Sequence, residues 1–595
     1  MTVPQKLALL REKMRAHGVN AVIVTTEDFH GSEYVGEHFK LREYLSGFDG
    51  SAGTLAVTER GAALWTDGRY FLQAGRRLSG SGIALMKQGE KGVPKLSEYL
   101  ADELCEGQTA AADGRTLSLR EARVIEKALA KKGAKLRLDE DIAGEAWSGR
   151  PPLSASPVWE LSARYAGESR ASKLSRLRGE LTRLGADVFA VSALDEIAWT
   201  LNLRGGDVAY NPVFLAYMLL DGESARLFAQ ESAFSAEIRG ALERDGVELL
   251  PYGGFYAALS GLSGKRVLLD PECANTLMAR SLPQDAELIE AQSPVQLMKA
   301  RKNEAEINGE RAAHIKDGAA VTRFIYWLKH NVAEGGITEL SAARKLEELR
   351  RAQDGYLGES FAPIIGYGAH GAIVHYSADE QTNAQLLPRG LVLCDTGGHY
   401  RGGTTDITRT VALGELTDEE KRCFTLVLAG HLELAAAVFP KGVRGANLDY
   451  AAREPLWRAG LDFNHGTGHG VGHILNVHEG PQRISWRISD GVQGAPLEAG
   501  MITSDEPGVY IEGKFGVRHE NLVLCKEREN TRFGSFLCFE ALTLVPFDLD
   551  AVDAALLTER ERGLLNSYHE RVYREISGLL PENEREWLKR ATAAI

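Results

Sequence analysis

Cysteine is scarce in this sequence, with 6 among 595 residues. No two cysteines stand in a C-x-x-C pair, which argues against a disulfide framework and against a structural zinc site. Cys394 stands directly before Asp395, where it could be taken for a nucleophile. Successive side chains of a strand point to opposite faces, so we predict that Cys394 is a small buried residue turned away from Asp395.

Long apolar runs and basic clusters are missing as well. No stretch reaches the ~18 consecutive apolar residues of a membrane-spanning helix. The N-terminal M-T-V-P-Q-K-L-A-L-L-R-E-K-M-R has charges where a secretory signal needs an apolar run. The net charge is -13 without an offsetting Lys/Arg cluster, which argues against nucleic acid or a membrane as a partner. We therefore expect a cytoplasmic protein.

The chain is long enough for three or four domains of about 150 residues, and its composition is that of an ordinary globular protein. Residues 5–28 and 172–195 both predict an amphipathic helix, a glycine stop and a buried strand. Two copies are too few for a solenoid, so we expect two sequential α/β domains. Aligned without gaps, the copies share Lys6 with Lys173, Leu7 with Leu174, Leu10 with Leu177, Arg11 with Arg178, Gly18 with Gly185 and Asp28 with Asp195.

The pattern changes between Gln292 and Lys302. The segment that follows has apolar residues at helical spacing and predicts a long helix that opens another domain. His314 on this helix is predicted to lie at the surface or at a boundary. The end of the chain predicts a charged amphipathic helix and a shorter one.

Four carboxylates in the second half of the chain are spaced as a metal site requires. Asp395 ends an apolar run, and Asp406 opens another after a glycine-rich connection, so the two can face each other. Glu506 and Glu520 repeat this arrangement around a predicted turn near Gly513.

Acids buried together repel and take up protons unless cations neutralise them. Two divalent ions would balance four negative charges. His469, in the run N-H-G-T-G-H-G-V-G, adds an imidazole to these hard oxygen ligands, which favours manganese and also allows cobalt or zinc. For any one acid alone, a solvated turn would be the simpler interpretation.

Two other motifs are approached but not met. His465 and His469 have the i, i+4 spacing of a zinc-protease helix, but the intervening glycines disfavour a helix and no Glu follows His465. The glycine run 466–472 lacks a Lys-Ser/Thr ending and has the wrong spacing for a dinucleotide fingerprint. Neither a helical zinc protease nor a nucleotide site is supported.

The ligand series, with the motifs G-A-I-V-H-Y, H-G-T-G-H-G-V-G and N-V-H-E-G-P, resembles the methionine-aminopeptidase-like ("pita-bread") metallopeptidases. Among these it is most similar to the long, three-domain aminopeptidase P family. The resemblance implies an α/β and α+β multidomain fold: two duplicated creatinase-like α/β domains, 1–158 and 159–300, before a pita-bread catalytic domain, 301–595, whose C-terminal helical tail spans about 541–595. It also implies a homodimer.

The resemblance further implies hydrolysis of the N-terminal Xaa-Pro bond of peptides, by a hydroxide that bridges two divalent ions. Asp406 and Glu520 are expected to bridge both ions. Asp395 is expected to chelate one, and His469 with Glu506 to hold the other.

Glu506 is also expected to shuttle a proton toward the leaving nitrogen. Three histidines match the family's non-ligand histidines. His478 and His375 are expected at the scissile and neighbouring carbonyls, and His465 at the residue after the cut. Arg518 is expected to orient a carboxylate.

Some segments are expected to set this chain apart. Lys40 stands where the family has an acid, which puts in doubt any acid-dependent contact of that domain. The segment R-I-S-D-G-V-Q-G-A-P, residues 487–496, is longer than expected and could touch substrate or a neighbouring subunit. Tyr376 and Trp457 could line an apolar pocket for a proline ring.

Three alternatives stay open. Prolidases cut Xaa-Pro dipeptides with the same ligands, although the duplicated domains and the tail favour the aminopeptidase. A non-catalytic peptide-binding module would not need the five ligands. A creatinase-type hydrolase shares the fold but works without metal.

Overall fold

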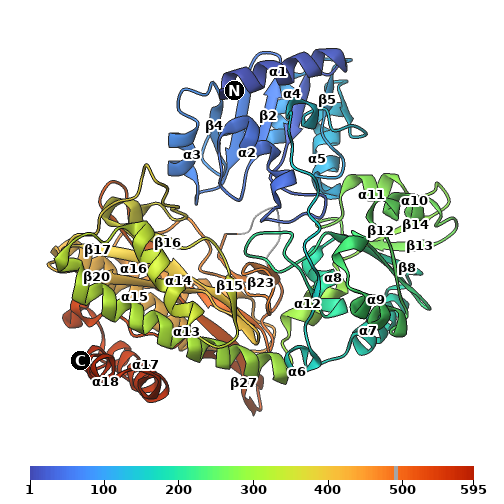
Figure 1. Ribbon diagram of the computed structural model, residues 1–595. Helices are drawn as coiled ribbons and strands as arrows, with labels where there is room; N and C mark the ends of the chain where they lie inside the picture. The colour runs from blue at the N-terminus through green and yellow to red at the C-terminus, as the bar shows by residue number, and fades with distance from the viewer. Residues whose placement is uncertain (488–493) are drawn as a thin grey trace. The chain divides into compact units, whose positions relative to one another are not determined.

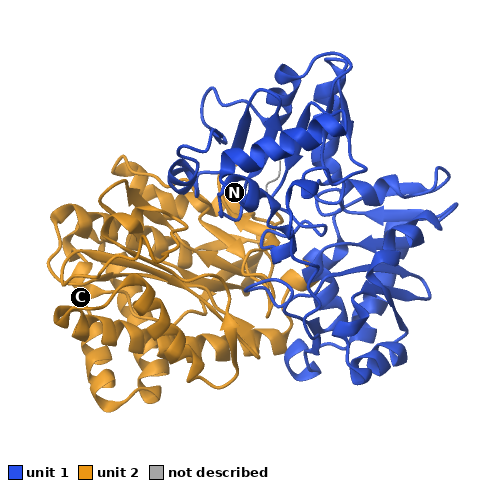
Figure 2. Ribbon diagram, turned by 45° about the horizontal axis from the view of Figure 1, so that its top comes forward, with its two compact units in different colours: residues 1–296 blue, residues 297–595 orange. Residues whose placement is uncertain are grey.

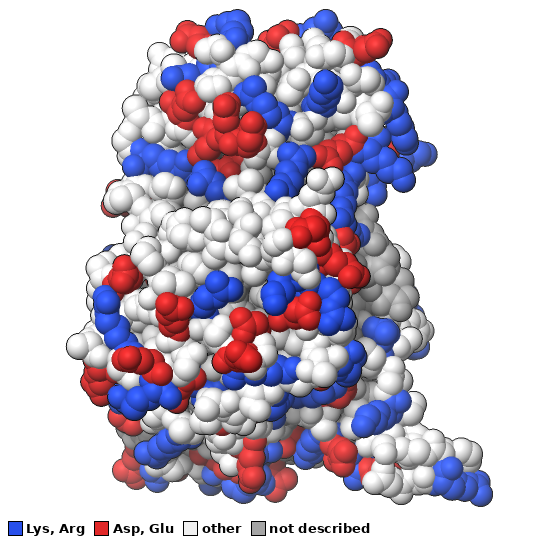
Figure 3. Space-filling view, turned by 90° about the vertical axis from the view of Figure 1, so that its right-hand side faces the viewer, with Lys and Arg blue, Asp and Glu red and all other residues white. Residues whose placement is uncertain are grey.

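The computed structural model describes residues 1–487 and 494–595. The chain forms two compact units, Met1–Gln296 and Leu297–Ile595 (Figure 2). Over the described ranges, every helix is too short or too polar to cross a lipid bilayer. On the face drawn in Figure 3, Lys and Arg side chains are interspersed with Asp and Glu.

Unit 1, Met1–Gln296, contains two six-stranded sheets with one strand order. In each, a central strand pairs antiparallel with one neighbour and parallel with the other. In order, the first sheet is β4 (Ala84–Lys87), β3 (Ala62–Thr66), β2 (Thr54–Thr58), β1 (Ala21–Val24), β5 (Thr109–Ala111) and β6 (Lys135–Arg137). The second is β12 (Val247–Pro251), β11 (Ala225–Ala229), β10 (Ala216–Asp221), β8 (Val188–Val191), β13 (Arg266–Leu269) and β14 (Glu287–Glu290). The shared order confirms the duplicated α/β fold.

In both copies, one helix precedes the central strand: α1 (Val3–Ala16) and α7 (Arg170–Leu184). Gly18 and Gly185 follow these helices with φ of +64° and +71°. Only glycine adopts this left-handed conformation without strain, which explains why the helix stop is glycine in both copies.

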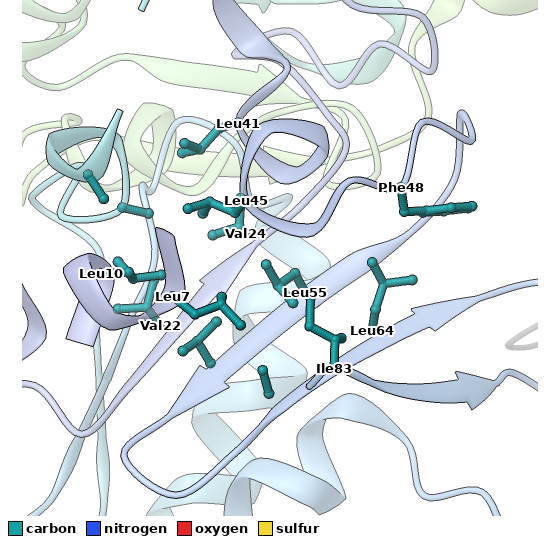
Figure 4. Close-up of a cluster of buried hydrophobic side chains, with 14 of the residues drawn as sticks. Leu7, Leu10, Val22, Val24, Leu41, Leu45, Phe48, Leu55, Leu64 and Ile83 are labelled. Carbon is teal, nitrogen blue, oxygen red and sulfur yellow. The ribbon is translucent and has the colours of Figure 1, made fainter. Parts of the chain in front are cut away.

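The first sheet is covered by the apolar side of α1. Leu7 and Leu10 of that helix pack with Val22 and Val24 of β1 and with Leu55 of β2 (Figure 4). All five side chains are buried. The helical spacing of Leu7 and Leu10 and the alternation of Val22 and Val24 therefore point into one core.

The repeated lysines make equivalent contacts. Lys6 Nζ donates to the carbonyl oxygen of Tyr44 (2.7 Å) and lies 4.0 Å from the centre of the Tyr44 ring. Lys173 Nζ donates to the carbonyl oxygen of Trp199 (3.0 Å) and lies 3.9 Å from its ring. Lys173 also donates to Asn202 Oδ1 (2.7 Å). One ammonium per copy thus joins the first helix to the next by a hydrogen bond and a cation–π contact.

Unit 2, Leu297–Ile595, carries four groups of strands. One three-stranded sheet is β16 (Ile364–Tyr367), β17 (Leu391–Thr396) and β20 (Ile407–Ala412), and another is β15 (Tyr356–Glu359), β18 (Gly398–Tyr400) and β19 (Gly403–Thr404). The six-stranded sheet is β21 (Val438–Pro440), β28 (Gly534–Ala541), β27 (Asn521–Thr531), β24 (Ile502–Asp505), β22 (Gly468–Gly470) and β23 (Glu479–Ile484). A hairpin is formed by β25 (Gly508–Ile511) and β26 (Phe515–Arg518).

Helices cover both faces of the sheet β16–β17–β20 (Figure 1). The main helices of this unit are α13 (Glu304–Asn331), α14 (Glu339–Arg351), α15 (Asp418–Ala435), α16 (Gly445–Arg458), α17 (Glu559–Ile576) and α18 (Glu582–Ala591). Phe324 of α13 packs with Val392 and Cys394, whereas Phe424 of α15 packs with Leu391. Cys394 is buried, on the side of α13, as the alternation along β17 predicts.

Helix α13 has a buried polar side, and here the sequence-based expectation for His314 was wrong. Glu306, Glu310, His314 and Asp317, at helical spacing, are all buried. His314 Nδ1 lies 2.8 Å from the carbonyl oxygen of Glu310 in the same helix. Charged residues at this spacing are typical of a solvent-exposed helix face. Here other segments of unit 2 cover that face, and the backbone N–H of Thr404, for example, donates to Glu310 (3.1 Å).

The two repeated lysines differ in burial, which predicts different effects of substitution. Lys173 is 1% exposed. Lys173→Met removes the donor to Asn202 Oδ1 and one of two donors to the Trp199 carbonyl oxygen, so it should lower the free energy of unfolding of unit 1 by about 1–3 kcal/mol. Lys6→Met at the half-buried site should lower it by less than about 1 kcal/mol. Urea unfolding of both variants measures the difference, and equal shifts would contradict this account.

Candidate metal centre

The first pair of acids lies on neighbouring strands. Asp395 is in β17, opposite Thr408 of β20, and Asp406 directly precedes β20. The chain between them forms β18 and β19. Pairing of β17 with β20 thus brings together the two carboxylates, which lie at opposite ends of the glycine-rich connection, as expected from the sequence.

The second pair of acids flanks the hairpin β25–β26. Glu506 lies between β24 and β25, and Glu520 lies between β26 and β27. Gly513 has a φ of +75° in the connection between β25 and β26, where a turn was predicted. Because β24 pairs with β27 (Asp505 opposite Asn521), the hairpin's two ends return to one place.

The side chains meet at His469 on β22. One ligand atom each from Asp406, His469 and Glu520 lies within 4.8 Å of the others. His469 Nε2 is 3.6 Å from Asp406 Oδ2 and 3.3 Å from Glu506 Oε1. Its Nδ1–H donates to the carbonyl oxygen of Gly470 (3.0 Å), a contact that orients the ring with Nε2 toward the carboxylates.

Burial and mutual repulsion shift the pKa values of these side chains. Burial, together with the charges of Glu520 and Asp395, raises the pKa of Asp406 well above its usual value. Burial and the charges of Glu506 and Asp395 raise the pKa of Glu520 to about 8. For His469, burial alone would lower the pKa, but Glu506 and Glu520 outweigh it and raise the pKa to about 9. The site therefore has a strong preference for added positive charge.

Two carboxylate oxygens of the cluster are buried without a hydrogen-bond partner among the described residues. They are Asp395 Oδ1 and Glu520 Oε1. The other oxygens of these groups are bonded, Glu520 Oε2 to Thr408 Oγ1 (2.8 Å) and Asp395 Oδ2 to Arg518 Nη2 (2.5 Å). Unpaired buried carboxylate oxygens are costly, so the donor set fits hard divalent cations.

Arg518 and Tyr510 hold this centre from one side. The guanidinium of Arg518 is buried, binds Asp395 and donates through Nη1 to Tyr510 Oη (2.7 Å). The hydroxyl of Tyr510 in turn donates to His465 Nε2 (2.8 Å). The expectation for Arg518 agrees with this geometry, whereas Tyr510 was missed, although the two residues belong to paired strands of the predicted hairpin.

His465 has both ring nitrogens engaged within the chain. Its Nδ1–H donates to the carbonyl oxygen of Gly466 (2.7 Å), while Nε2 accepts from Tyr510. Burial lowers the pKa of His465 to about 4, so the ring is neutral. A contact with substrate would therefore use the face or carbon edge of this ring.

The remaining two histidines also come to this region. The ring of His478 lies 4.4 Å from that of His469, edge to face at 82°. His375 is half-buried and follows Val374, whose carbonyl oxygen lies 3.4 Å from Arg518 Nη2. Contacts or charges thus join eight of the nine residues singled out from the sequence to one group of carboxylates, and for His375 it is the preceding residue that contacts Arg518.

Four further features predicted from the sequence lie outside the group of carboxylates described above or outside the described residues. Tyr376 is buried and donates to Glu339 Oε2 (2.7 Å). Trp457 on α16 is 39% exposed beside Trp486, at a centroid distance of 5.9 Å, and is not a core residue. Lys40 pairs with Glu37 at 2.5 Å. The inner part of the 487–496 segment, residues 488–493, lies outside the described residues.

We expect Arg518→Lys to weaken binding of a divalent cation by about 10- to 100-fold, because a lysine cannot reproduce the two simultaneous contacts with Asp395 and Tyr510. Tyr510→Phe keeps the Asp395 contact and should weaken binding by less than about 10-fold. Calorimetric titration of the metal-free chain with Mn²⁺ measures both. Unchanged affinity in Arg518→Lys would show that Asp395 needs no orienting partner.

Known protein families match segments along nearly the whole chain. Family models match as follows: Creatinase/Prolidase N-terminal domain at residues 6–139 and again at 149–306, metallopeptidase family M24 at 308–527, and the C-terminal region of peptidase M24 at 535–595. Unit 2 thus has the pita-bread fold of that family.

Relatives from different organisms align with this chain over nearly its full length. Aminopeptidase P2 of Arabidopsis thaliana is 40% identical, over 99% of this chain and 88% of its own. A probable Xaa-Pro aminopeptidase P of Laccaria bicolor is 41% identical, over 98% and 92%.

Solved structures add two comparisons. X-prolyl aminopeptidase from Caenorhabditis elegans, described as a cytosolic enzyme with a di-nuclear active site, superposes with a TM-score of 0.96 at 35% identity over 100% of both chains. A Xaa-Pro dipeptidase from Bacillus anthracis shares the fold over 64% of this chain and 99% of its own, with a TM-score of 0.51 at 23% identity. The chain belongs to metallopeptidase family M24, in its aminopeptidase P branch.

Proposed function

We propose that the chain removes the N-terminal residue from peptides with proline in second position, with two divalent cations held by a set of five side chains. The observation that carries this proposal is the meeting of buried acids from two separate strand pairs at one imidazole, with two carboxylate oxygens left for a cation. The five residues are Asp395, Asp406, His469, Glu506 and Glu520. The activity named for the full-length relatives supports the same conclusion.

Two such cations, when bound, supply Lewis acidity that makes a water nucleophilic near neutral pH. We assign the role of general base to Glu506. It is less buried than Asp406 and Glu520, and its Oε1 accepts from Ser504 Oγ (3.1 Å). Although burial opposes it, the contact with His469 keeps the pKa of Glu506 below its usual value. We assign to this carboxylate the removal of a proton from the attacking water and its delivery to the leaving proline nitrogen.

The developing negative charge on the carbonyl oxygen needs hydrogen-bond donors. We assign His478 and His375 to the scissile carbonyl and its neighbour. The ring of His478 packs against that of His469, and His375 follows Val374, whose carbonyl oxygen contacts Arg518. His465, a neutral ring fixed by Tyr510 and Gly466, is assigned to the residue after the cut. Its apolar faces suit packing against a proline ring.

Proline after the cut explains why a dedicated enzyme exists. The Xaa-Pro bond is a tertiary amide, so it lacks the N–H that general peptidases bind, and the ring restricts the backbone. A site for this bond must recognise the ring by shape instead of by a backbone hydrogen bond.

We also propose the finer properties that the resemblance implies. Manganese suits the oxygen-rich ligand set, with cobalt or zinc as alternatives. A cytoplasmic location is supported by the cytosolic C. elegans enzyme. The division at 158 is supported by the two separate sheets of unit 1, and the division at 300 lies near the boundary between the compact units at Gln296 and Leu297. A homodimer is supported by the exposed aromatic group Tyr450, Trp457 and Trp486, since such groups mark protein interfaces; sedimentation of the purified chain tests it.

Asp406→Asn should abolish peptide hydrolysis, because the acid that is grouped with both His469 and Glu520 loses its charge. Elemental analysis should find about two divalent ions per wild-type chain and almost none in the variant. The free energy of unfolding of the metal-free variant should be unchanged or higher, because a source of repulsion is gone. Near-normal turnover in this variant would overturn the metal assignment.

Substrate length separates the aminopeptidase from a prolidase. We expect Arg-Pro-Pro-type tripeptides and longer Xaa-Pro-Yaa peptides to be cut with kcat/KM at least about 10-fold above that of an Xaa-Pro dipeptide, which corresponds to about 1.4 kcal/mol of added transition-state binding. Steady-state kinetics on matched peptides measures the ratio. A preference for dipeptides would favour the prolidase alternative.

A further inference from the structure

A buried ion pair joins two helices behind the metal centre. Arg350 of α14 binds Asp317 of α13 through two contacts, Nε to Oδ1 (2.7 Å) and Nη2 to Oδ2 (3.1 Å). Both side chains are 0% exposed. A fully buried ion pair gives little net stability compared with apolar residues of the same size. Stability alone therefore does not explain this pair, and its other contacts indicate a further role.

Each member of the pair also holds one end of the hairpin β18–β19. Arg350 donates to the carbonyl oxygen of Gly397 (3.1 Å) and to Thr396 Oγ1 (3.1 Å). Asp317 accepts from Thr405 Oγ1 (2.6 Å) and, at the other oxygen, from Tyr400 Oη (3.0 Å). The ion pair therefore closes both strands of this connection against the two helices.

The residues held in this way are the direct neighbours of two proposed ligands. Thr396 follows Asp395, and Thr405 precedes Asp406. Neighbouring side chains of an extended segment face opposite sides, so the helices hold one side while the carboxylates project from the other. The two ends are close: a Cβ on Gly397 would lie 2.1 Å from the carbonyl oxygen of Thr405.

The hydroxyl of Thr405 joins Asp317 to the first residue of β18. It donates to Asp317 and accepts from the backbone N–H of Gly398 (2.9 Å). Without it, Asp317 loses its contact with the segment that leads into Asp406, and the N–H of Gly398 loses a buried acceptor.

We propose that Asp317 and Arg350 are positioning residues that set the separation of Asp395 and Asp406 by clamping the chain one residue from each. This inference rests on the metal centre proposed above. Groups that orient metal ligands typically contribute 10- to 100-fold to metal affinity or activity, and the clamp acts on two ligands at once.

The test compares two isosteric changes in the full-length chain. Thr405→Val removes the linking hydroxyl. Thr322→Val, on α13, removes a hydroxyl that is equally buried and makes no hydrogen bond to the described residues, so it is the matched control. The measurements are Mn²⁺ affinity by calorimetry, kcat and KM on an Arg-Pro-Pro-type peptide, and urea unfolding of the metal-free protein.

We expect Thr405→Val to weaken Mn²⁺ binding about 10-fold or more and to lower kcat more than it changes KM, while Thr322→Val matches the wild type. Asp317→Asn, which keeps the shape but removes the charge, should weaken Mn²⁺ binding at least as much. A purely structural role would lower the unfolding midpoint of Thr405→Val and leave its Mn²⁺ affinity unchanged, which would overturn the inference.

Failure of the proposed metal centre and failure of the clamp alone give different results in these measurements. A wild-type chain that neither binds Mn²⁺ nor cuts the peptide overturns the proposed function and the clamp with it. A wild type that does both, beside a Thr405→Val variant with wild-type affinity and kcat, overturns the clamp alone.

Discussion

Repulsion among buried carboxylates is the constraint on which the catalytic unit depends. Asp406 and Glu520 are almost completely buried, and their pKa values are raised because each lies in the field of the other acids. Such a group is tolerated only where cations or protons compensate it. The surrounding structure has to hold acids together that would otherwise separate, and this explains why so many rigid elements meet at the site.

Two strand pairs hold the acids through their register, and helix α13 holds the segments that carry two of the acids. The register of β17 with β20 and of β24 with β27 places each acid within about one residue of a paired strand. Arg518 anchors Asp395 from the hairpin, while the buried polar side of α13 contacts the segments that carry the acids. Polar groups that look solvent-facing in sequence thus work inside the protein.

Unit 1 shows how far local patterns reach. The repeated lysine, leucine and glycine positions indicated a duplicated α/β domain, and the two sheets have the same strand order. These features were predictable because helix periodicity, a left-handed glycine and a buried strand are properties of neighbouring residues. The tertiary contact that explains the lysine, a hydrogen bond to the next helix with an aromatic ring beneath the ammonium, was not visible in the pattern.

The sequence by itself determined the chemistry of the centre: four acids, an imidazole and glycine-rich connections at spacings that match strand ends and turns. Only the tertiary structure decided which oxygens stay unpaired, that Tyr510 links Arg518 to His465, and that His314 and Asp317 are inside. The physical reason is that covalent spacing limits which residues can share a strand or helix face, whereas burial depends on which distant segment covers that face.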